Sequence, residues 1–178
     1  MKRTWQATLA LTAVTAVFFG TAATTAHADD DPPPSAPAAK WEIKSDNGRC
    51  LDATPDPKEG VAVVTWSPCH ESSAQLWGRG QGGAVGHEQY YLYDTPSLCV
   101  TRTSGSVGSG VYTLQKCDED TQENRKGAQD FRHLPQGDPN VGQIRNRRHG
   151  EYLKDNGHNV PISGVAGSAN RWDFKKIV

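Results

Sequence analysis

Residues 48–52 read Gly-Arg-Cys-Leu-Asp, residues 63–69 read Val-Val-Thr-Trp-Ser-Pro-Cys, and residues 74–77 read Ala-Gln-Leu-Trp. In a β-strand, residues two apart point to the same side. We therefore expect Gln75 and Trp77 to face the interior together, with the indole filling the core and the amide able to bond to the backbone.

The same three-part pattern occurs twice more along the chain. The second copy comprises Ser97-Leu98-Cys99-Val100-Thr101, then 111–117, then Ala128-Gln129-Asp130-Phe131; the third comprises Gly150-Glu151-Tyr152-Leu153-Lys154, then 160–164, then Ala169-Asn170-Arg171-Trp172. Self-similarity at roughly 40 to 50 residues indicates units that bury their apolar faces only against one another. Trp77, Phe131 and Trp172 occupy the same place in the three copies, so we expect all three in the core.

Between these landmarks the chain consists of short β-like runs broken by Gly, Pro, Asn and Asp. The runs are Trp41–Lys44, Ala62–Trp66, Tyr90–Tyr93, Val111–Gln115 and Tyr152–Lys154. No amphipathic helix of useful length is visible. The pattern predicts an all-β protein.

The order G-x-C-L-D, a second Cys and then Q-x-W resembles the ricin B-type lectin repeat, and the resemblance covers residues 41–178. It implies a β-trefoil of three imperfect repeats, at about 41–86, 87–136 and 137–178, with about twelve strands and the Q-x-W aromatic in the core.

The resemblance also implies a sugar site in the first repeat. Galactose-binding members use the Asp after the first Cys, an aromatic residue shortly before the second Cys, and an Asn ahead of Q-x-W. Asp52 and Trp66 match the first two, His70 and Gln75 are further candidates, and the Asn position is Ala74. The carboxylate would hold sugar hydroxyls while the ring stacks on the apolar sugar face.

The second and third repeats depart from this pattern. Thr101 and Lys154 stand where the Asp belongs, and alanines replace the Asn. An Asp-to-Lys exchange inverts the charge and hydrogen-bonding polarity, so inherited sugar recognition is not expected there. Asp52 itself has a structural alternative, the capping of a turn before residues 54–57.

Two functions follow from these observations. The first is a secreted, non-catalytic lectin that binds a galactose-type glycan through its first repeat. The alternative is a protein-docking β-trefoil, a subunit or adaptor of a secreted toxin or inhibitor assembly whose sugar pockets are lost. The sequence does not predict the oligomeric state.

Four cysteines allow three disulfide connectivities. Cys50 and Cys69 are 19 residues apart, and Cys99 and Cys117 are 18 residues apart. The C-x-x-C spacing that would suggest a metal site does not occur. The similar spacings favour the local bridges Cys50–Cys69 and Cys99–Cys117, each worth ~3 kcal/mol through loop closure.

The N-terminus reads as an export signal. A basic start at Lys2-Arg3, an apolar stretch and Ala26-His27-Ala28 predict a signal peptide over 1–28. The apolar run is too short to span a membrane, and no later segment is long enough. Residues 29–40 are rich in Pro and Asp and predict a disordered lead-in. We therefore expect a secreted, extracellular protein.

After removal of residues 1–28, seventeen basic residues face twenty acidic ones, a net charge of −3. This balance argues against a nucleic-acid partner. The distribution is uneven, because residues 141–178 carry seven basic and three acidic residues. These charges either form a basic face that attracts an anionic partner or are merely solvated.

Signals for catalysis, cofactors or metals are weak. Residues 78–83 satisfy G-x-G-x-x-G, but no βαβ unit surrounds them, so we expect a loop between repeats and no cofactor. The histidines show no paired ligand spacing, and no nucleophile-elbow motif occurs. We expect no metal site and no enzymatic activity.

Overall fold

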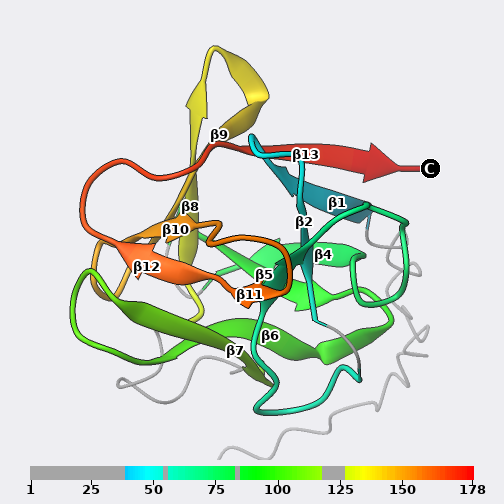
Figure 1. The fold of residues 1–178 in the computed structure, drawn as a ribbon, viewed down its shortest axis with the longest axis horizontal. Helices are drawn as coiled ribbons and strands as arrows, with labels where there is room; N and C mark the ends of the chain where they lie inside the picture. Colours follow the sequence, from blue (N-terminus) through cyan, green and yellow to red (C-terminus); the bar gives the residue numbers. More distant parts are fainter. Residues whose placement is uncertain (1–38, 54–55, 83–84, 118–126) are drawn as a thin grey trace, which may run out of the picture. The chain divides into compact units, whose positions relative to one another are not determined.

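The computed structural model describes residues 39–53, 56–82, 85–117 and 127–178. This part of the chain contains β-strands and no helix (Figure 1). The strands are β1 (Lys40–Ser45), β2 (Cys50–Asp52), β3 (Val64–Trp66), β4 (Trp77–Gln81), β5 (Glu88–Leu92), β6 (Thr95–Ser104), β7 (Gly110–Lys116), β8 (Phe131–Gln136), β9 (Asp138–Asn146), β10 (Tyr152–Lys154), β11 (Val160–Pro161), β12 (Ser163–Val165) and β13 (Trp172–Ile177). The predicted signal peptide, 1–28, and nearly all of the predicted lead-in, 29–40, lie outside the described residues.

Six strands form a closed ring of antiparallel pairs. Following the pairing from strand to strand gives β1, β4, β5, β8, β9, β13 and then β1 again. Closure leaves no strand in the ring with an unpaired edge. Each repeat contributes its first and last strand to the ring.

The remaining strands form three hairpins, one per repeat: β2–β3, β6–β7 and β10–β12. The hairpins also pair with one another, through β3–β11, β7–β12 and an isolated bridge between Ala62 and Thr113. A six-stranded ring joined to three mutually paired hairpins is a β-trefoil, which confirms the predicted fold.

The third repeat has five strands where four were predicted. β11 and β12 are separated by Ile162, which is fully buried and whose N–H donates to the carbonyl of Val63. Before Ile162 the chain pairs with β3, and after it the chain pairs with β10 and β7. The extra strand is therefore one predicted strand that changes partners midway.

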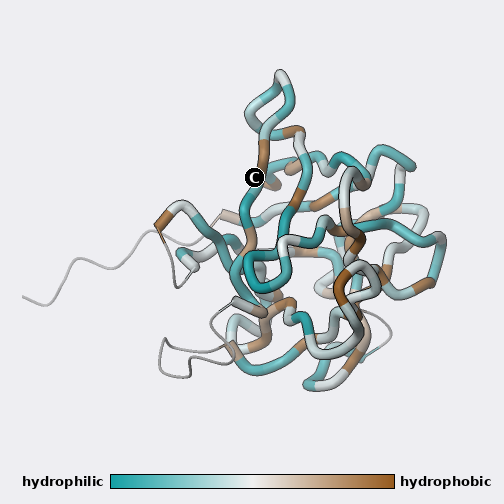
Figure 2. The backbone as a smooth tube through the Cα atoms, turned by 90° about the vertical axis from the view of Figure 1, so that its left-hand side faces the viewer, coloured by the Kyte–Doolittle hydropathy of each residue, from teal (hydrophilic) through white to brown (hydrophobic). Residues whose placement is uncertain are grey.

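Short apolar stretches lie between polar ones along the chain, as the colouring of Figure 2 shows. Trp77, Phe131 and Trp172 are all fully buried in one core cluster, which confirms their predicted place. The Trp77 indole N–H donates to the carbonyl of Leu51 at 3.0 Å, and that of Trp172 donates to Leu153 at 3.2 Å. These matching bonds confirm the alignment of the first and third repeats.

Both predicted disulfides are formed, Cys50–Cys69 and Cys99–Cys117. Each bridge joins the first strand of a hairpin to the chain just after the second strand, in equivalent places of the first two repeats. The third hairpin has no cysteines: in the alignment of the repeats Tyr152 and Gly164 take their places, and the register pairs Tyr152 with Val165 and Leu153 with Gly164.

The prediction of a loop at 78–83 was wrong for its first four residues, because β4 continues through Gln81. The Tyr91 ring packs directly over Gly78, where an added Cβ would lie 2.0 Å from a ring carbon. The glycine thus makes room for a cross-strand aromatic ring rather than for a phosphate.

No helix among the described residues has the length and apolarity needed to cross a bilayer.

Candidate functional site

The four predicted site residues gather around the first hairpin. Asp52 ends β2 and Trp66 ends β3, while His70 and Gln75 lie between β3 and β4. The register pairs Cys50 with Trp66 and Asp52 with Val64. Directly opposite residues project to the same side of a sheet, so Asp52 and Trp66 share one face of the hairpin.

Hydrogen bonds connect three of the four residues. The Gln75 amide N–H donates to the Asp52 carboxylate at 2.8 Å. The Gln75 carbonyl oxygen accepts from the backbone N–H of His70 at 2.8 Å and lies 2.8 Å from the His70 ring nitrogen Nδ1. Asp52 and Gln75 are fully buried, whereas His70 is exposed. The network therefore runs from a buried carboxylate to the surface.

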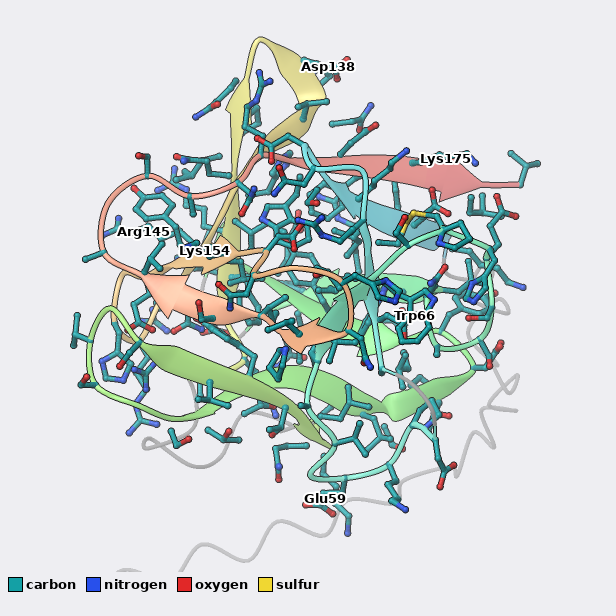
Figure 3. The ribbon with its side chains drawn as sticks, in the orientation of Figure 1. Glu59, Trp66, Asp138, Arg145, Lys154 and Lys175 are labelled. Carbon is teal, nitrogen blue, oxygen red and sulfur yellow. A yellow bond between two sulfur atoms is a disulfide. The ribbon has the colours of Figure 1, made fainter. Side chains whose placement is uncertain are left out.

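Trp66 is half-buried and contacts a residue that the sequence did not suggest. Its ring centroid lies 4.4 Å from that of His158, and the two planes are tilted by 51°. His158 also accepts a hydrogen bond at Nδ1 from the backbone N–H of Ser67, at 3.1 Å. His158 belongs to the third repeat, and the pairing of β11 with β3, together with a bridge between Thr65 and His158, brings it here. Figure 3 marks Trp66 on this side of the protein.

The corresponding places in the other two repeats are hollows with different chemistry. In the second repeat, Thr101 and Gln129 line a cavity of about 230 Å³, and the Gln129 amide donates to the Thr101 hydroxyl at 3.0 Å. In the third repeat, Lys154 and Asn170 line a cavity of about 350 Å³. A hydroxyl and an ammonium group thus replace the carboxylate of the first repeat.

A buried carboxylate that sequence reasoning missed joins the first and third repeats. Asp155 accepts hydrogen bonds from the Ser45 hydroxyl at 2.6 Å, the Thr65 hydroxyl at 2.7 Å and Arg49 Nε at 2.9 Å. Burial alone would raise the pKa of Asp155, but the bonds from Arg49, Ser45, Thr65 and the Gly157 N–H lower it to about 2. Asp155 is therefore a structural anion.

A second buried ion pair joins the second and third repeats. Arg102 Nε donates to Glu151 at 2.6 Å, and both side chains are buried. Burial raises the pKa of Glu151, but the hydrogen bonds from Arg102 and from the Gly108 N–H outweigh it and lower the pKa. The Glu151 carboxylate accepts its hydrogen bonds from Arg102 and the Gly108 N–H, so this pair is structural too.

Among the described residues, one group of potential metal ligands comes close enough to share an ion: Glu42, Cys50 and Cys69. Both cysteines are bonded to each other. Because a disulfide offers no thiolate to a metal, this group does not fit a metal site.

The closed ring and the three mutually paired hairpins define the class of the molecule: it is a β-trefoil protein. The chain matches no family model and no curated protein sequence. Solved structures do resemble it. The designed threefold-symmetric protein ThreeFoil has a TM-score of 0.65 at 12% identity, covering 76% of this chain and 96% of that chain.

Two natural proteins share the fold. The ricin B-like lectin of Macrolepiota procera, solved in complex with lactose, has a TM-score of 0.57 at 10% identity and covers 80% of this chain and 98% of its own. The cytolethal distending toxin of Actinobacillus actinomycetemcomitans has a TM-score of 0.56 at 17% identity, covering 79% of this chain and 91% of that chain. At these identities the likeness establishes the fold.

Proposed function

We propose that the protein is a secreted, non-catalytic carbohydrate-binding module whose first repeat holds a galactose-type sugar. One observation carries the proposal: the Gln75 amide holds the Asp52 carboxylate on the hairpin face that also carries the half-exposed Trp66. A fixed carboxylate beside an accessible aromatic ring is a combination that suits a sugar with vicinal hydroxyls and an apolar face.

Each predicted residue then has a distinct role. Asp52 accepts hydrogen bonds from two sugar hydroxyls, and Trp66 stacks on the apolar face of the ring. Gln75 positions the carboxylate, and the exposed imidazole of His70 offers a polar group at the rim of the site. The lactose bound to the Macrolepiota lectin supports a galactose-type ligand by likeness of fold.

Sugar binding at this site requires a local opening. The exposed fraction of Asp52 is 0%, so a hydroxyl reaches its carboxylate only when the groups covering it move. We expect part of the binding energy to be spent on this opening, which lowers the apparent affinity. The site is therefore expected to bind weakly, with a Kd of roughly 0.1–1 mM for a single sugar.

Secretion belongs to the same proposal. The predicted signal peptide over 1–28 and two disulfides among the described residues fit an oxidising, extracellular environment. Mass spectrometry of the culture medium tests it, because the exported protein should begin at Asp29.

The test of the sugar site compares Asp52→Asn with a matched control, Asp56→Asn. Both changes remove one carboxylate from the same segment, but Asp56 is exposed and pairs with Lys58 at the surface. By calorimetry with lactose and galactose, we expect Asp52→Asn to weaken binding at least tenfold and Asp56→Asn to leave it unchanged. Equal affinity of both variants and the unaltered protein contradicts the site.

The second candidate function is protein docking. It is favoured by the loss of the carboxylate at Thr101 and Lys154, and by the likeness to a toxin whose fold includes a β-trefoil. A pull-down of secreted proteins separates the two functions. Capture of one protein that survives Asp52→Asn, together with no affinity for any galactose-containing glycan, favours docking.

A further inference from the structure

A row of basic side chains runs from the last strand of the second repeat into the third repeat. The strand register places Arg132 of β8 directly opposite Arg145 of β9, and Arg145 directly opposite Tyr152 of β10. Lys154 lies two residues after Tyr152 and so points to the same side. Figure 3 shows Arg145 and Lys154 on the same side of the protein, away from Trp66. We name Arg132, Arg145, Tyr152 and Lys154 the basic face.

Within the described residues, the cations of the basic face have no acidic partners. Arg132, Arg145 and Lys154 are exposed, and none of them forms an ion pair with a carboxylate in the part of the chain that the structure describes. Like charges directly opposite each other destabilise a sheet. The Arg132–Arg145 pair therefore costs stability in the isolated protein, and an anion bound between the two strands would remove that cost.

Arg145 is held in place rather than free in solvent. Its Nε donates to the Gly150 carbonyl at 3.0 Å, and its guanidinium carbon lies 5.7 Å from the centroid of the Tyr152 ring. Gly150 has a φ of +65°, and a Cβ there would meet the Arg145 guanidinium at 2.7 Å. The carbonyl and the ring thus hold this cation in a defined place, which reduces the entropy that binding would cost.

The basic face adjoins the cavity of the third repeat. Val165, directly opposite Tyr152, lines that cavity together with Lys154, Ser168 and Asn170. The cavity also contains the carboxylate of Asp46, whose oxygens accept from the Asn170 amide at 2.7 Å and the Arg171 N–H at 3.2 Å. A ligand for this place carries negative charge toward Arg145 and Lys154 and hydroxyl groups toward Asp46 and Ser168.

We infer that the basic face and its cavity form a second ligand site, specific for an acidic glycan whose sugars carry carboxylate or sulfate groups. The ligand class rests on the proposed function, since a polysaccharide supplies both the charge and the hydroxyls. Guanidinium groups bind carboxylate and sulfate oxygens through paired hydrogen bonds. Tyr152, half-buried between Arg145 and Lys154, offers a ring for one sugar to stack on.

The experiment uses the full secreted protein and measures its affinity for heparin, polygalacturonate and neutral dextran. Heparin carries sulfate and carboxylate, and polygalacturonate carries carboxylate alone, so the two probes separate the sources of charge. We expect heparin, polygalacturonate or both to bind and dextran not to bind. Absence of binding to both acidic glycans overturns the inference.

Charge reversal locates the site. Arg145→Glu/Lys154→Glu should weaken binding of the acidic glycan at least tenfold. The matched control, Lys58→Glu/Lys176→Glu, makes the same change in net charge at two exposed lysines outside the basic face, and should change the affinity less than twofold. If reversal at Arg145 disturbs folding, Lys154→Gln alone should still weaken binding severalfold. An equal loss in the control means attraction by overall charge and overturns the site.

Two further arms test the specificity and separate the two proposals. Single-stranded DNA and polyglutamate should bind at least tenfold more weakly than the acidic glycan; equal binding overturns a glycan site. Asp52→Asn should leave binding of the acidic glycan intact. Arg145→Glu/Lys154→Glu should likewise leave lactose binding intact. Loss of lactose binding alone therefore refutes only the proposed function, and loss of acidic-glycan binding alone refutes only this inference.

Discussion

One position sets the chemistry of each repeat, and it is occupied by Asp52, Thr101 and Lys154 in turn. In the first repeat the Gln75 amide reaches the carboxylate of Asp52, and in the second Gln129 reaches the hydroxyl of Thr101. In the third repeat the equivalent residue is Asn170, whose side chain is one methylene shorter than that of Gln. Asn170 hydrogen-bonds to the Asp155 N–H and to Asp46, and Lys154 lines the cavity. One fold position thus carries three different groups.

Trp66 provides the first prediction. Because its ring is half-exposed and packs on His158, Trp66→Ala should lower the free energy of unfolding by only ~1–2 kcal/mol while weakening lactose binding at least tenfold. Urea unfolding and calorimetry measure the two effects. The comparison variant is Trp77→Ala, which opens a cavity in the core and should cost ~3–5 kcal/mol. Similar unfolding costs for the two variants would show that Trp66 is a core residue.

Asp155 provides the second prediction. Asp155→Ala leaves the half-buried Arg49 and the Ser45 hydroxyl without this acceptor, while the Thr65 hydroxyl keeps the Gly157 carbonyl. We expect a loss of ~3–5 kcal/mol in the free energy of unfolding. Asp138→Ala, at the exposed end of the β8–β9 hairpin, should change it by less than ~0.5 kcal/mol. Equal urea midpoints for the two variants contradict the structural role of Asp155.

At the scale of single elements, local patterns predicted part of what the structure contains. Runs of β-branched and aromatic residues gave the positions of five strands, because these patterns depend on near neighbours along the chain. They could not reveal that β12 begins only after Ile162, since the break follows from pairing with strands of other repeats. The continuation of β4 through Gly78 likewise depends on the Tyr91 ring across the sheet.

The two disulfides should differ in their functional effect. The β2–β3 hairpin has three-residue strands and carries Asp52 and Trp66, whereas β6 and β7 pair over a much longer register. Removing either bridge, as Cys50→Ala/Cys69→Ala or Cys99→Ala/Cys117→Ala, should lower the free energy of unfolding by ~3 kcal/mol.

Lactose binding distinguishes the two bridges. Below the unfolding transition, we expect the Cys50→Ala/Cys69→Ala protein to lose most of its affinity and the Cys99→Ala/Cys117→Ala protein to keep it. Calorimetry at low temperature provides the measurement. Retained affinity without the first bridge would mean that the short hairpin is ordered by other contacts.

For the molecule as a whole, buried ion pairs connect the repeats. Asp155 links the third repeat to the first through Arg49, and Glu151 links the third to the second through Arg102. Neither pair could be predicted from local patterns, because the two members of each pair lie 106 and 49 residues apart along the chain. Only strand register decides which charges meet, and His158 escaped sequence reasoning for the same reason.

These carboxylates predict the pH dependence of stability. The folded protein lowers the pKa of Asp155 to about 2, against an unfolded value of about 3.9, and also lowers the pKa of Glu151. Because a depressed carboxyl pKa stabilises the charged folded form, this contribution is complete above about pH 4 and is lost as the pH falls toward 2.

Asp155 should therefore account for about 2 kcal/mol of the acid-induced loss. Urea unfolding between pH 7 and pH 2 measures the decline, and Asp155→Asn should make it less steep. A decline of the same size in Asp155→Asn would assign the acid sensitivity to other carboxylates.

The most direct test of the sugar site is an NMR titration of the ¹⁵N-labelled protein with lactose. We predict that the shifts concentrate on the indole N–H of Trp66, the side-chain amide of Gln75 and the backbone N–H of His70, while the buried indoles of Trp77 and Trp172 stay unchanged. Resonances that do not move at tens of millimolar lactose, or that move only in another repeat, would contradict a sugar site in the first repeat.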